Sequence, residues 1–383
     1  MERSTEAAAD VDRINTFFPL MPQLGMRWAR TRPWEDLTIA VNAHLTTLTA
    51  ALLRELTLGG GSWVVCAANV HTTDAGVVEL LRAQGIEVVH GRDRDNHDRH
   101  LATIAHGPEL VADVGFELLG TLLSRSPDHI ASVKGAVEIT RTGINRLRAI
   151  RELPFGVVNI NDSELKYNVE NRHGVGEGLW PCLTDITGMH LSGRRVLIVG
   201  YGPVGQGVAS YARARGASVE VVEIDPIRRL VANYDGFPTP SADEGLRRAD
   251  IAVTVSGVPH AITVKQLRAV GSDLLLVNAG HGADEIDVTG LRAAAVRGDQ
   301  LGPHCVRYQL RDKGPWLTVL GGGNPLNIVL NAGSPEPVLL HFALLGLTLE
   351  WLAKGSLPPG EVIVPRELQA EVARLALSAR GHG

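Results

Sequence analysis

One glycine-rich segment has the spacing of a nucleotide-binding turn. Gly200-Tyr201-Gly202-Pro203-Val204-Gly205 has the form G-x-G-x-x-G and stands between a predicted strand and a predicted helix. In such a turn the first glycine permits the tight bend, the second lets the backbone approach a pyrophosphate, and the third lets helix and strand pack closely. The phosphates then meet free N–H groups at a helix N-terminus. We therefore expect a dinucleotide site at Gly200, Gly202, Pro203, Val204 and Gly205; the plainer alternative is a tight turn without a ligand.

A carboxylate follows at the end of the next predicted strand. Glu223 lies about 20 residues beyond the turn, where a carboxylate hydrogen-bonds the ribose 2′-hydroxyl and repels a 2′-phosphate. This residue predicts NAD rather than NADP as the cofactor. Arg228, on the following segment, is the one feature that works against that preference.

Other ionisable side chains have the chemistry of an acid–base site. Lys166 follows Asn161-Asp162-Ser163 and precedes Glu170-Asn171. A lysine amine within reach of a hydroxyl can act as a general base, although a lone lysine is usually a solvated surface charge. Asp113 ends an apolar run, where it could instead cap a helix. His44 stands among apolar residues, which is also typical of a core histidine.

The middle third of the chain alternates strands and helices. Short runs typical of buried parallel strands occupy residues 195–199, 218–223, 251–255 and 274–278. A helix is expected through residues 209–215. Because ligands bind at the carboxyl ends of parallel strands, His281, just beyond the fourth run, is expected near the cofactor. The pattern predicts an α/β fold with a doubly wound parallel sheet.

The first third repeats this pattern more weakly. Residues 63–67, 86–90 and 110–113 are predicted strands of a second α/β domain, and residues 338–352 form a predicted apolar helix. With 383 residues, the chain suits two domains. We expect a domain of residues 1–165, completed by 334–383, and a Rossmann nucleotide-binding domain of residues 166–333.

Composition excludes several classes of partner. Apolar residues make up 44% and charged residues 21%, as in soluble globular proteins, and the net charge is −5 without a long basic block. We expect no nucleic-acid partner, no membrane span and, from a polar N-terminus, no signal peptide. The three scattered cysteines suit a reducing cytoplasm and small buried thiols. No metal site is expected, and the charged run 92–100 is predicted to be a solvated loop.

Several ordered segments resemble S-adenosyl-L-homocysteine hydrolases. The resemblance covers most of the chain and is far more specific than the glycine motif alone. The matching segments are Ala43-His44-Leu45-Thr46, Asn159 to Ser163 with Lys166, Glu170-Asn171, Gly200 to Gly205, Glu223 to Pro226, Asn278 to His281 with Glu285 to Val288, and the stretch around Asn327.

The resemblance implies roles for these residues. In this family NAD takes a hydride from C3′ of a ribose, the resulting ketone acidifies the C4′ hydrogen, the 5′ substituent leaves, and NAD is finally regenerated. Lys166 is implied to assist 3′-hydroxyl deprotonation, with Glu170 and Asn171 ordering it, and Asp113 and His44 to be the acid–base pair. The implied cofactor contacts are Thr140, Thr142, Ser256, Asn278, Gly280, His281 and Asn327, and the implied substrate positions are Thr46, Leu48, Glu138 and Ser334.

Some positions depart from the family pattern. Ile139 replaces the second of two glutamates, and Glu170 is one methylene longer than the usual aspartate. Leu48 stands where a polar side chain reads the adenine amino group, and Ser334 replaces a histidine. A site that hydrogen-bonds its substrate discriminates through groups left unpaired by the wrong one, so these changes are expected to alter base recognition. The short C-terminus puts the family's usual tetramer in question, although a homo-oligomer, dimer or tetramer, is still expected.

The favoured interpretation is a divergent, NAD-dependent enzyme that acts on a modified nucleoside. Transient 3′-oxidation would allow loss of water to an exocyclic alkene, as in nucleoside-antibiotic biosynthesis. The ordinary hydrolase, giving adenosine and homocysteine, is the main alternative. A dehydrogenase that releases NADH and a non-catalytic NAD sensor are the others.

Overall fold

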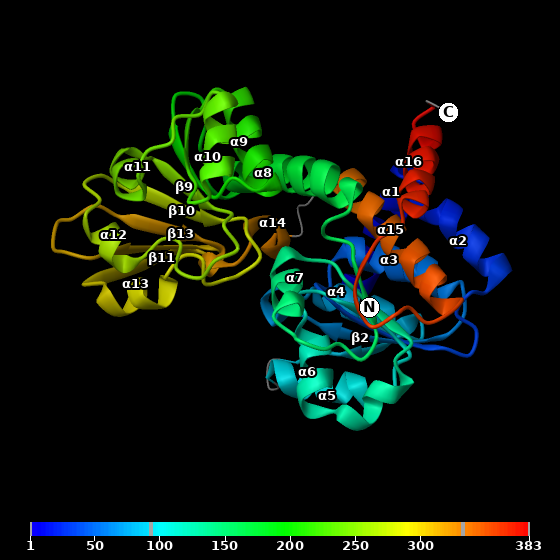
Figure 1. Ribbon diagram of the computed structural model, residues 1–383. Helices are drawn as coiled ribbons and strands as arrows, with labels where there is room; N and C mark the ends of the chain where they lie inside the picture. Colours follow the sequence, from blue (N-terminus) through cyan, green and yellow to red (C-terminus); the bar gives the residue numbers. More distant parts are fainter. Residues whose placement is uncertain (1, 92–94, 331–333, 382–383) are drawn as a thin grey trace. The chain divides into compact units, whose positions relative to one another are not determined.

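The chain forms two compact units. The computed structural model describes residues 2–91, 95–330 and 334–381 (Figure 1). Unit 1 comprises Met1–Glu170 with Pro335–Gly383, and unit 2 comprises Asn171–Ser334. Unit 1 thus ends at Glu170 rather than at the expected residue 165, because the π-helix η3 (Leu165–Val175) starts in unit 1 with Lys166 and Glu170 buried. The other expected boundary, at residue 333, lies outside the described residues.

Unit 1 is built on a seven-stranded sheet in which every strand pair is parallel. Its strand order is β14-β6-β5-β4-β1-β2-β3. The strands are β1 (Thr38–Ala43), β2 (Ser62–Ala67), β3 (Glu87–Val89), β4 (Leu110–Asp113), β5 (Gly135–Glu138), β6 (Gly156–Asn159) and β14 (Gly360–Ile363). The chain runs outward from β1 to β3 and then returns to place β4 on the other side of β1. The carboxyl ends of β1 and β4 therefore flank a topological switch point, where α/β sheets bind ligands.

Helices cover this sheet. They are α1 (Glu2–Phe17), α2 (Leu20–Thr31), α3 (Thr47–Thr57), α4 (Ala75–Ala83), α5 (Asn96–Ile104), α6 (Glu117–Arg125), α7 (Arg141–Arg148), α15 (Pro335–Ala353) and α16 (Arg366–Ala379), with short 3₁₀ turns at Val70–Thr72 and Pro127–Ser132. Helix α15 is long and apolar enough to cross a membrane, but 67% of its most apolar window is buried inside the protein. It is therefore the core helix of unit 1.

Unit 2 is built on a mixed sheet of order β11-β12-β13-β10-β9-β7-β8. The strands are β7 (Arg195–Val199), β8 (Ser218–Val222), β9 (Ile251–Thr254), β10 (Leu274–Asn278), β11 (Arg297–Gly302), β12 (Cys305–Gln309) and β13 (Leu317–Leu320). The helices are α8 (Gly176–Thr187), α9 (Pro203–Ala214), α10 (Pro226–Tyr234), α11 (Ala242–Arg248), α12 (Val264–Arg268), α13 (Val288–Ala294) and α14 (Leu326–Val329), with a 3₁₀ turn at Gly321–Gly323. β8 and β9 lie on opposite sides of β7, so the switch point of this sheet lies between β7 and β9.

The α/β class and all seven predicted strands are confirmed, and no strand end is shifted by more than one residue. Two expectations were wrong. The second sheet is not wholly parallel, because β12 pairs antiparallel with both β11 and β13. The run 92–100 is not a solvated loop where it is described, because helix α5 starts at Asn96 and buries Arg99 and His100; residues 92–94 lie outside the described residues.

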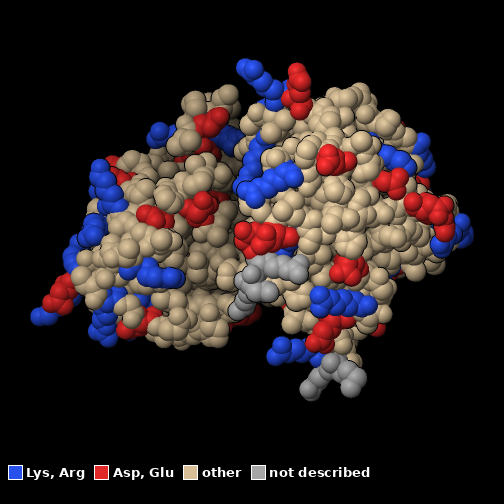
Figure 2. All heavy atoms as spheres, turned by 90° about the horizontal axis from the view of Figure 1, so that it is seen from below, with Lys and Arg blue, Asp and Glu red and all other residues tan. Residues whose placement is uncertain are grey.

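Surface charge agrees with the composition. On the face drawn in Figure 2, basic and acidic side chains are interspersed over the described residues, and no continuous basic stripe is visible there. Two of the three thiols, Cys66 and Cys182, are buried as expected, whereas Cys305 is only half-buried.

Candidate functional site

The glycine-rich turn follows β7 and leads into α9, as the motif requires. Gly200 has a φ of +111°, and a Cβ there would lie 2.7 Å from the carbonyl oxygen of Val255 at the end of β9. A Cβ on Gly205 would lie 2.2 Å from the carbonyl oxygen of Gly200. Both positions therefore admit only glycine without movement of the backbone. They fix the turn at the switch point of the unit 2 sheet.

The middle of the turn is open. A Cβ on Gly202 would meet a single atom within 4 Å, Nη1 of Arg228 at 3.9 Å. Gly202 is the N-cap residue of α9 without a side-chain cap, Pro203 occupies the first helical turn, and Val204 packs against the core of unit 2. The exposed N–H groups of this helix start can therefore meet a phosphate, and the cradle fits the pyrophosphate of a dinucleotide.

Glu223 ties the turn to the next strand. Its carboxylate accepts hydrogen bonds from the backbone N–H of Tyr201 (2.7 Å), Ile224 (2.7 Å) and Asp225 (2.9 Å). The side chain is half-buried at the end of β8, as the sequence predicts for a ribose-binding acid. The phenol of Tyr201 donates to Asp235 at 2.7 Å, which holds the far side of the turn.

A polar network joins the ends of β9 and β10. The Asn278 amide oxygen accepts from the Thr254 hydroxyl (3.1 Å) and the Gly280 N–H (2.7 Å). The Asn278 amide nitrogen donates to the carbonyl oxygens of Gly282 (2.6 Å) and Gly323 (2.8 Å). Asn278 is fully buried, so it shapes the loop that carries Gly280 and the half-buried His281.

Glu285 belongs to this network, although no role was predicted for it. It accepts from the backbone N–H (2.8 Å) and hydroxyl (2.9 Å) of Ser256 and from the backbone N–H of Gly257 (3.0 Å). Burial raises the pKa of its carboxyl. Ser256, a predicted cofactor contact, is thereby fixed at the end of β9. Glu285 lies in the segment Glu285 to Val288 that carries the family resemblance, and this was the available signal.

Asn327 lies in α14 of the same unit. It is buried, and its side-chain oxygen has no hydrogen-bond partner among the described residues. An orphaned buried acceptor is costly, so a ligand or water that donates to it would be stabilised. This observation fits the predicted contact with a cofactor.

In unit 1, His44 lies just beyond the end of β1. Its Nδ1 is 2.7 Å from the Thr72 hydroxyl, which lies after β2, and its carbonyl oxygen accepts from the Thr49 hydroxyl at 2.6 Å. Thr46 is the N-cap residue of α3, and its side chain accepts from the Thr49 N–H. The imidazole is therefore held at the switch point of the unit 1 sheet.

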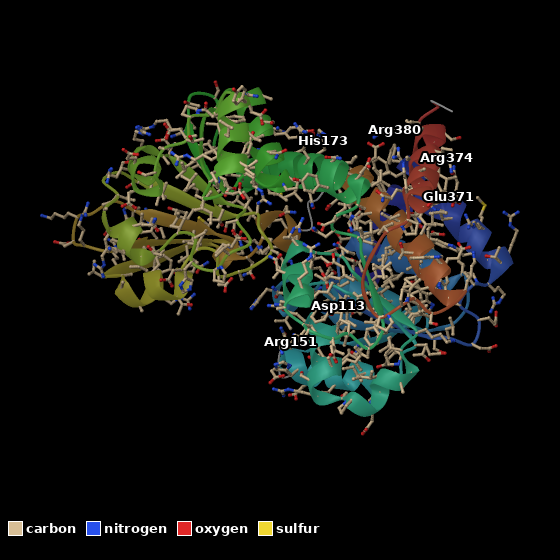
Figure 3. All side chains as sticks on the ribbon, viewed as in Figure 1. Asp113, Arg151, His173, Glu371, Arg374 and Arg380 are labelled. Carbon is tan, nitrogen blue, oxygen red and sulfur yellow. The ribbon has the colours of Figure 1, made fainter. Side chains whose placement is uncertain are left out.

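Asp113 ends β4, on the other side of the same switch point (Figure 3). One carboxylate oxygen accepts from the Asn42 amide (2.8 Å) and the other from the Leu119 N–H (2.8 Å). The side chain is fully buried, and burial raises the pKa of its carboxyl. The structure thus brings Asp113 and His44 to one edge of one sheet, although they are far apart in the sequence.

Glu138 ends the neighbouring strand β5. Its carboxylate accepts from the N–H groups of Gly115 (3.1 Å), Phe116 (2.8 Å) and Thr140 (2.7 Å), and from the Thr140 hydroxyl (2.8 Å). It is fully buried, and burial and then the charge of Asp113 raise the pKa of its carboxyl. In this conformation Glu138 therefore acts on the loop after β4, and a direct contact with substrate requires rearrangement.

Lys166 and Glu170 form a buried ion pair along η3. The Lys166 ammonium lies 2.6 Å from the Glu170 carboxylate, and the side chains are 9% and 7% exposed. An ammonium so placed is not the usual solvated surface charge. Asn171, the next residue, is half-buried and begins unit 2.

His341 also approaches Lys166, and sequence reasoning missed it. It lies in α15, is 4% exposed, and its Nδ1 has no hydrogen-bond partner among the described residues. Burial, and then the charge of Lys166, lower the pKa of His341 well below the ordinary range. Within an apolar helix this residue gave no sequence signal beyond its type.

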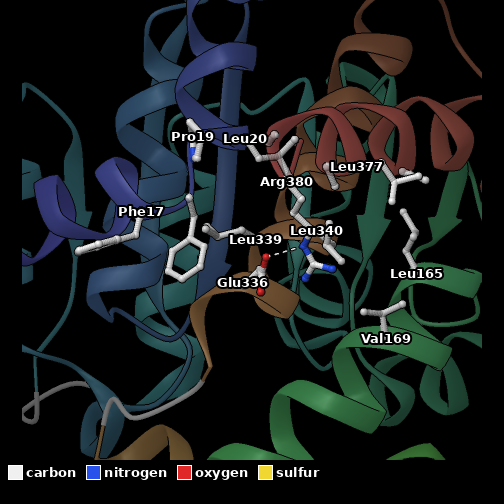
Figure 4. A pocket seen from close by; sticks show the side chains of 14 residues that line it. Phe17, Pro19, Leu20, Leu165, Val169, Glu336, Leu339, Leu340, Leu377 and Arg380 are labelled. Carbon is white, nitrogen blue, oxygen red and sulfur yellow. Dashed lines mark hydrogen bonds and ion pairs between the residues drawn. The ribbon is translucent and has the colours of Figure 1, made fainter. Parts of the chain in front are cut away.

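An apolar cavity of about 280 Å³ adjoins these helices (Figure 4). Leu165 and Val169 of η3 line it together with Leu339 and Leu340 of α15, so the two helices lie side by side. Glu336 and Arg380 form an ion pair of 2.7 Å at its edge. The cavity carries no acid–base chemistry of its own.

The remaining predicted residues lie near helix starts in unit 1 or at the end of unit 2, and among them Thr140 is bonded to Glu138. Leu48 is buried in α3, Thr142 lies in the first turn of α7, and Thr140 is the N-cap residue of α7. Ser334 is half-buried at the end of unit 2.

A glycine-rich turn after β7, a carboxylate that follows the next strand and a switch point in the sheet are the features of a nucleotide-binding domain of an α/β enzyme. Residues 171–333 match the family model for the NAD-binding domain of S-adenosyl-L-homocysteine hydrolase. An adenosylhomocysteinase of Nostoc sp. is 35% identical over 95% of this chain and 88% of its own length. One of Thermococcus kodakarensis is 32% identical over 97% of this chain and 90% of its own length.

The chain therefore belongs to the S-adenosyl-L-homocysteine hydrolase family, and its cofactor is NAD. An S-inosyl-L-homocysteine hydrolase of Methanopyrus kandleri is also similar, with 32% identity over 94% of this chain and 88% of its own length. Relatives named for two different bases thus lie at comparable distance from this chain.

Proposed function

We propose that this chain is an NAD-dependent enzyme that oxidises the 3′-hydroxyl of a nucleoside transiently and eliminates a group from C5′. The observation that carries the proposal is the set of buried ionisable groups in unit 1. A buried Lys166–Glu170 pair supports deprotonation of a hydroxyl, and Asp113 and His44 support acid–base work at one sheet edge. When bound, NAD supplies the hydride acceptor.

The residues of this chain have separate tasks in the proposed reaction. Lys166 passes its own proton to the paired Glu170 and, as the neutral amine, takes the proton of the 3′-hydroxyl; Glu170 also holds the lysine in place. His44 and Asp113 exchange protons with C4′ and with the group leaving C5′. Ser256, Asn278, Gly280, His281 and Asn327 line the cofactor side, with Thr140 and Thr142 as further cofactor contacts. Thr46 and Ser334 contact the substrate.

The favoured net reaction is dehydration of a modified nucleoside. Leu48 stands where the family reads the adenine amino group, and it is buried in α3 and offers no polar atom. The expected substrate is therefore a nucleoside whose base lacks that amino group or carries a different substituent. The close S-inosyl relative supports a family site that tolerates other bases.

The ordinary hydrolase is the second candidate, because two of the relatives above are named adenosylhomocysteinase. A panel of S-adenosylhomocysteine, S-inosylhomocysteine, adenosine and ketose nucleosides separates the two by mass spectrometry. Free homocysteine supports the hydrolase, and a product lighter by one water supports dehydration. Deuterium from solvent at C4′ is expected in both cases, in the released nucleoside for hydrolysis and in recovered substrate for dehydration, whereas its absence with every compound would identify a non-catalytic NAD sensor. Net accumulation of NADH would instead indicate a simple dehydrogenase.

The same proposal covers assembly and location. The enzyme is expected to act as a homo-oligomer, dimer or tetramer, in the cytoplasm. Sedimentation of the NAD-loaded protein tests the oligomer, and a monomer at micromolar concentration would contradict it.

A further inference from the structure

Two buried carboxyl groups lie side by side in unit 1. Asp113 and Glu138 are register partners at the ends of the adjacent parallel strands β4 and β5. Both side chains are fully buried. In adjacent strands, register partners carry their side chains on the same face of the sheet, so the two carboxyls face a common environment.

Every hydrogen-bond partner of the two carboxyls is neutral. Asp113 accepts from the Asn42 amide and the Leu119 N–H. Glu138 accepts from three backbone N–H groups and the Thr140 hydroxyl. Among the described residues, no lysine, arginine or histidine forms an ion pair with either one.

The charged and titratable groups that face the pair are engaged elsewhere. On α6, Glu117 pairs with Arg146 of α7 at 3.4 Å, and Arg146 also donates to the Gly115 carbonyl at 2.7 Å. On α5, Arg99 donates to the carbonyl oxygens of Ala67 (3.3 Å) and Gly91 (3.2 Å). On β2, burial raises the pKa of the Cys66 thiol to about 11, so it stays neutral.

Two adjacent buried carboxylates without a cation cannot both be ionised near neutral pH. We propose that Asp113 and Glu138 share a single proton in the resting enzyme and that Glu138 acts through Asp113 as its positioning residue. Four donors favour the charge on Glu138, whereas Asp113 has two, so the proton resides on Asp113. Burial raises the pKa of both carboxyls, in agreement with a proton held by the pair.

The shared proton assigns roles in the proposed elimination, and this step rests on the proposed function. Asp113 starts protonated and is therefore the acid, which leaves His44 as the base. His44 takes the C4′ proton, the C4′–H electron pair forms the C4′=C5′ bond, and the C5′–O bond breaks. The Asp113 proton passes to the leaving oxygen, which departs as water. Asp113 ends as a carboxylate and His44 as an imidazolium, and proton transfer between them through solvent restores both.

The pair can be tested without substrate. Infrared spectroscopy of protein with ¹³C-labelled aspartate carboxyls is expected to show one protonated aspartate at pH 7. In Glu138→Gln the neighbouring charge is gone, so Asp113 ionises and the band disappears. A wild-type protein without that band at pH 7 would overturn the placement of the proton on Asp113, and an unchanged band in Glu138→Gln would overturn the coupling of the two carboxyls. If Glu138→Gln does not fold, Thr140→Val serves instead, because it removes one hydrogen-bond donor from Glu138. The pH at which the protonated-aspartate band is lost is then expected to differ from that of wild type.

Catalysis is measured separately. Glu138→Gln is expected to slow deuterium exchange at C4′ by about tenfold or more and to move its pH profile, while reduction of bound NAD is unchanged. Glu109→Gln is the matched control, because Glu109 directly precedes β4 but is 26% exposed and paired with Lys134 at 2.9 Å. Its exchange rate should stay within about twofold of wild type. If wild type exchanges the C4′ hydrogen of no nucleoside, the proposed function fails. The infrared result still shows whether Asp113 holds the proton of the carboxyl pair.

Discussion

The two units build their sites in different ways. In unit 2 the nucleotide cradle is made of backbone, and a continuous stretch of sequence, Gly200 to Gly205, encodes it. In unit 1 the acid–base groups are side chains from the ends of separate strands and helices. They meet only because the sheet order places β1 beside β4 and β5 beside β4. The first kind of site is visible in the sequence, and the second becomes explicit only in the fold.

The two kinds of site tolerate different substitutions. A backbone cradle fails when a side chain enters it, whatever the chemistry of that side chain. A buried side-chain site fails when a charge loses its partner or gains a neighbour. Matched substitutions within each unit can therefore test this contrast.

The largest effect is expected from Lys166→Met. Removal of the proposed base should lower the rate of reduction of bound NAD by about 10²–10⁴-fold. The unpaired, buried Glu170 should also cost about 3–5 kcal/mol in the free energy of unfolding. Stopped-flow absorbance of enzyme-bound NADH and urea titration measure the two effects.

Lys354→Met is the matched control for that variant. Lys354 pairs with Glu350 at the same helical spacing and at 3.0 Å, but its side chain is 67% exposed. Its loss should change stability by less than about 1 kcal/mol and leave NAD reduction intact. Retention of NAD reduction within tenfold in Lys166→Met would remove the lysine from the chemistry.

Gly205→Ala should act on the cofactor alone. The added Cβ would lie 2.2 Å from the Gly200 carbonyl oxygen, so the turn must open and lose its fit to the pyrophosphate. Equilibrium dialysis is expected to show NAD bound at least about tenfold more weakly. Gly271→Ala, where a Cβ meets nothing within 4 Å, should bind NAD as wild type does. Equal affinity in both variants would show that the turn does not hold the cofactor.

The buried carboxyl pair predicts a pH-dependent stability. Because burial raises the pKa of Asp113 and Glu138, the folded state holds more protons than the unfolded chain from about pH 4 up to neutral pH. The free energy of unfolding therefore falls as pH rises through that window. Glu138→Gln should remove much of this fall. Between pH 5 and pH 8 the variant should therefore lose less free energy of unfolding than wild type does, by on the order of 1–2 kcal/mol. Denaturant titration at the two pH values measures this, and parallel pH profiles of the two proteins would contradict it.

The contrast between units also sets what the sequence can reveal. The strands of the Rossmann unit from β7 to β10 were predictable because each is a mostly apolar run beside a turn signal. Strand β14 was not, because it follows Pro358-Pro359 and alternates in burial, ending at a strongly exposed Ile363. The antiparallel edge of the second sheet was missed because Arg297–Gly302 is mostly exposed and has no apolar pattern.

Site residues follow the same division. The turn and Glu223 could be predicted from spacing, and the family resemblance supplied Lys166, His44 and Asp113. The partnership of Asp113 with Glu138 depends on strand register, which no local pattern states. His341 beside Lys166 depends on how α15 packs against η3. These pairings arise from tertiary packing, and they set the charges that the chemistry needs.

The smallest effect is expected at Arg228, a cation beside the cradle. Arg228 reaches toward Gly202 but is exposed, so solvent and salt screen its charge. Arg228→Ala should therefore weaken NADP more than NAD, by only about two- to threefold, and the difference should shrink at high salt. Arg229→Ala is the control, because Arg229 instead donates to the Thr239 carbonyl at 2.8 Å. Competition dialysis of NAD and NADP at two salt concentrations measures the ratio. A large loss of NAD affinity in Arg228→Ala would mean that a side chain, and not backbone alone, holds the pyrophosphate, and the contrast between the two units would be weaker than the structure indicates.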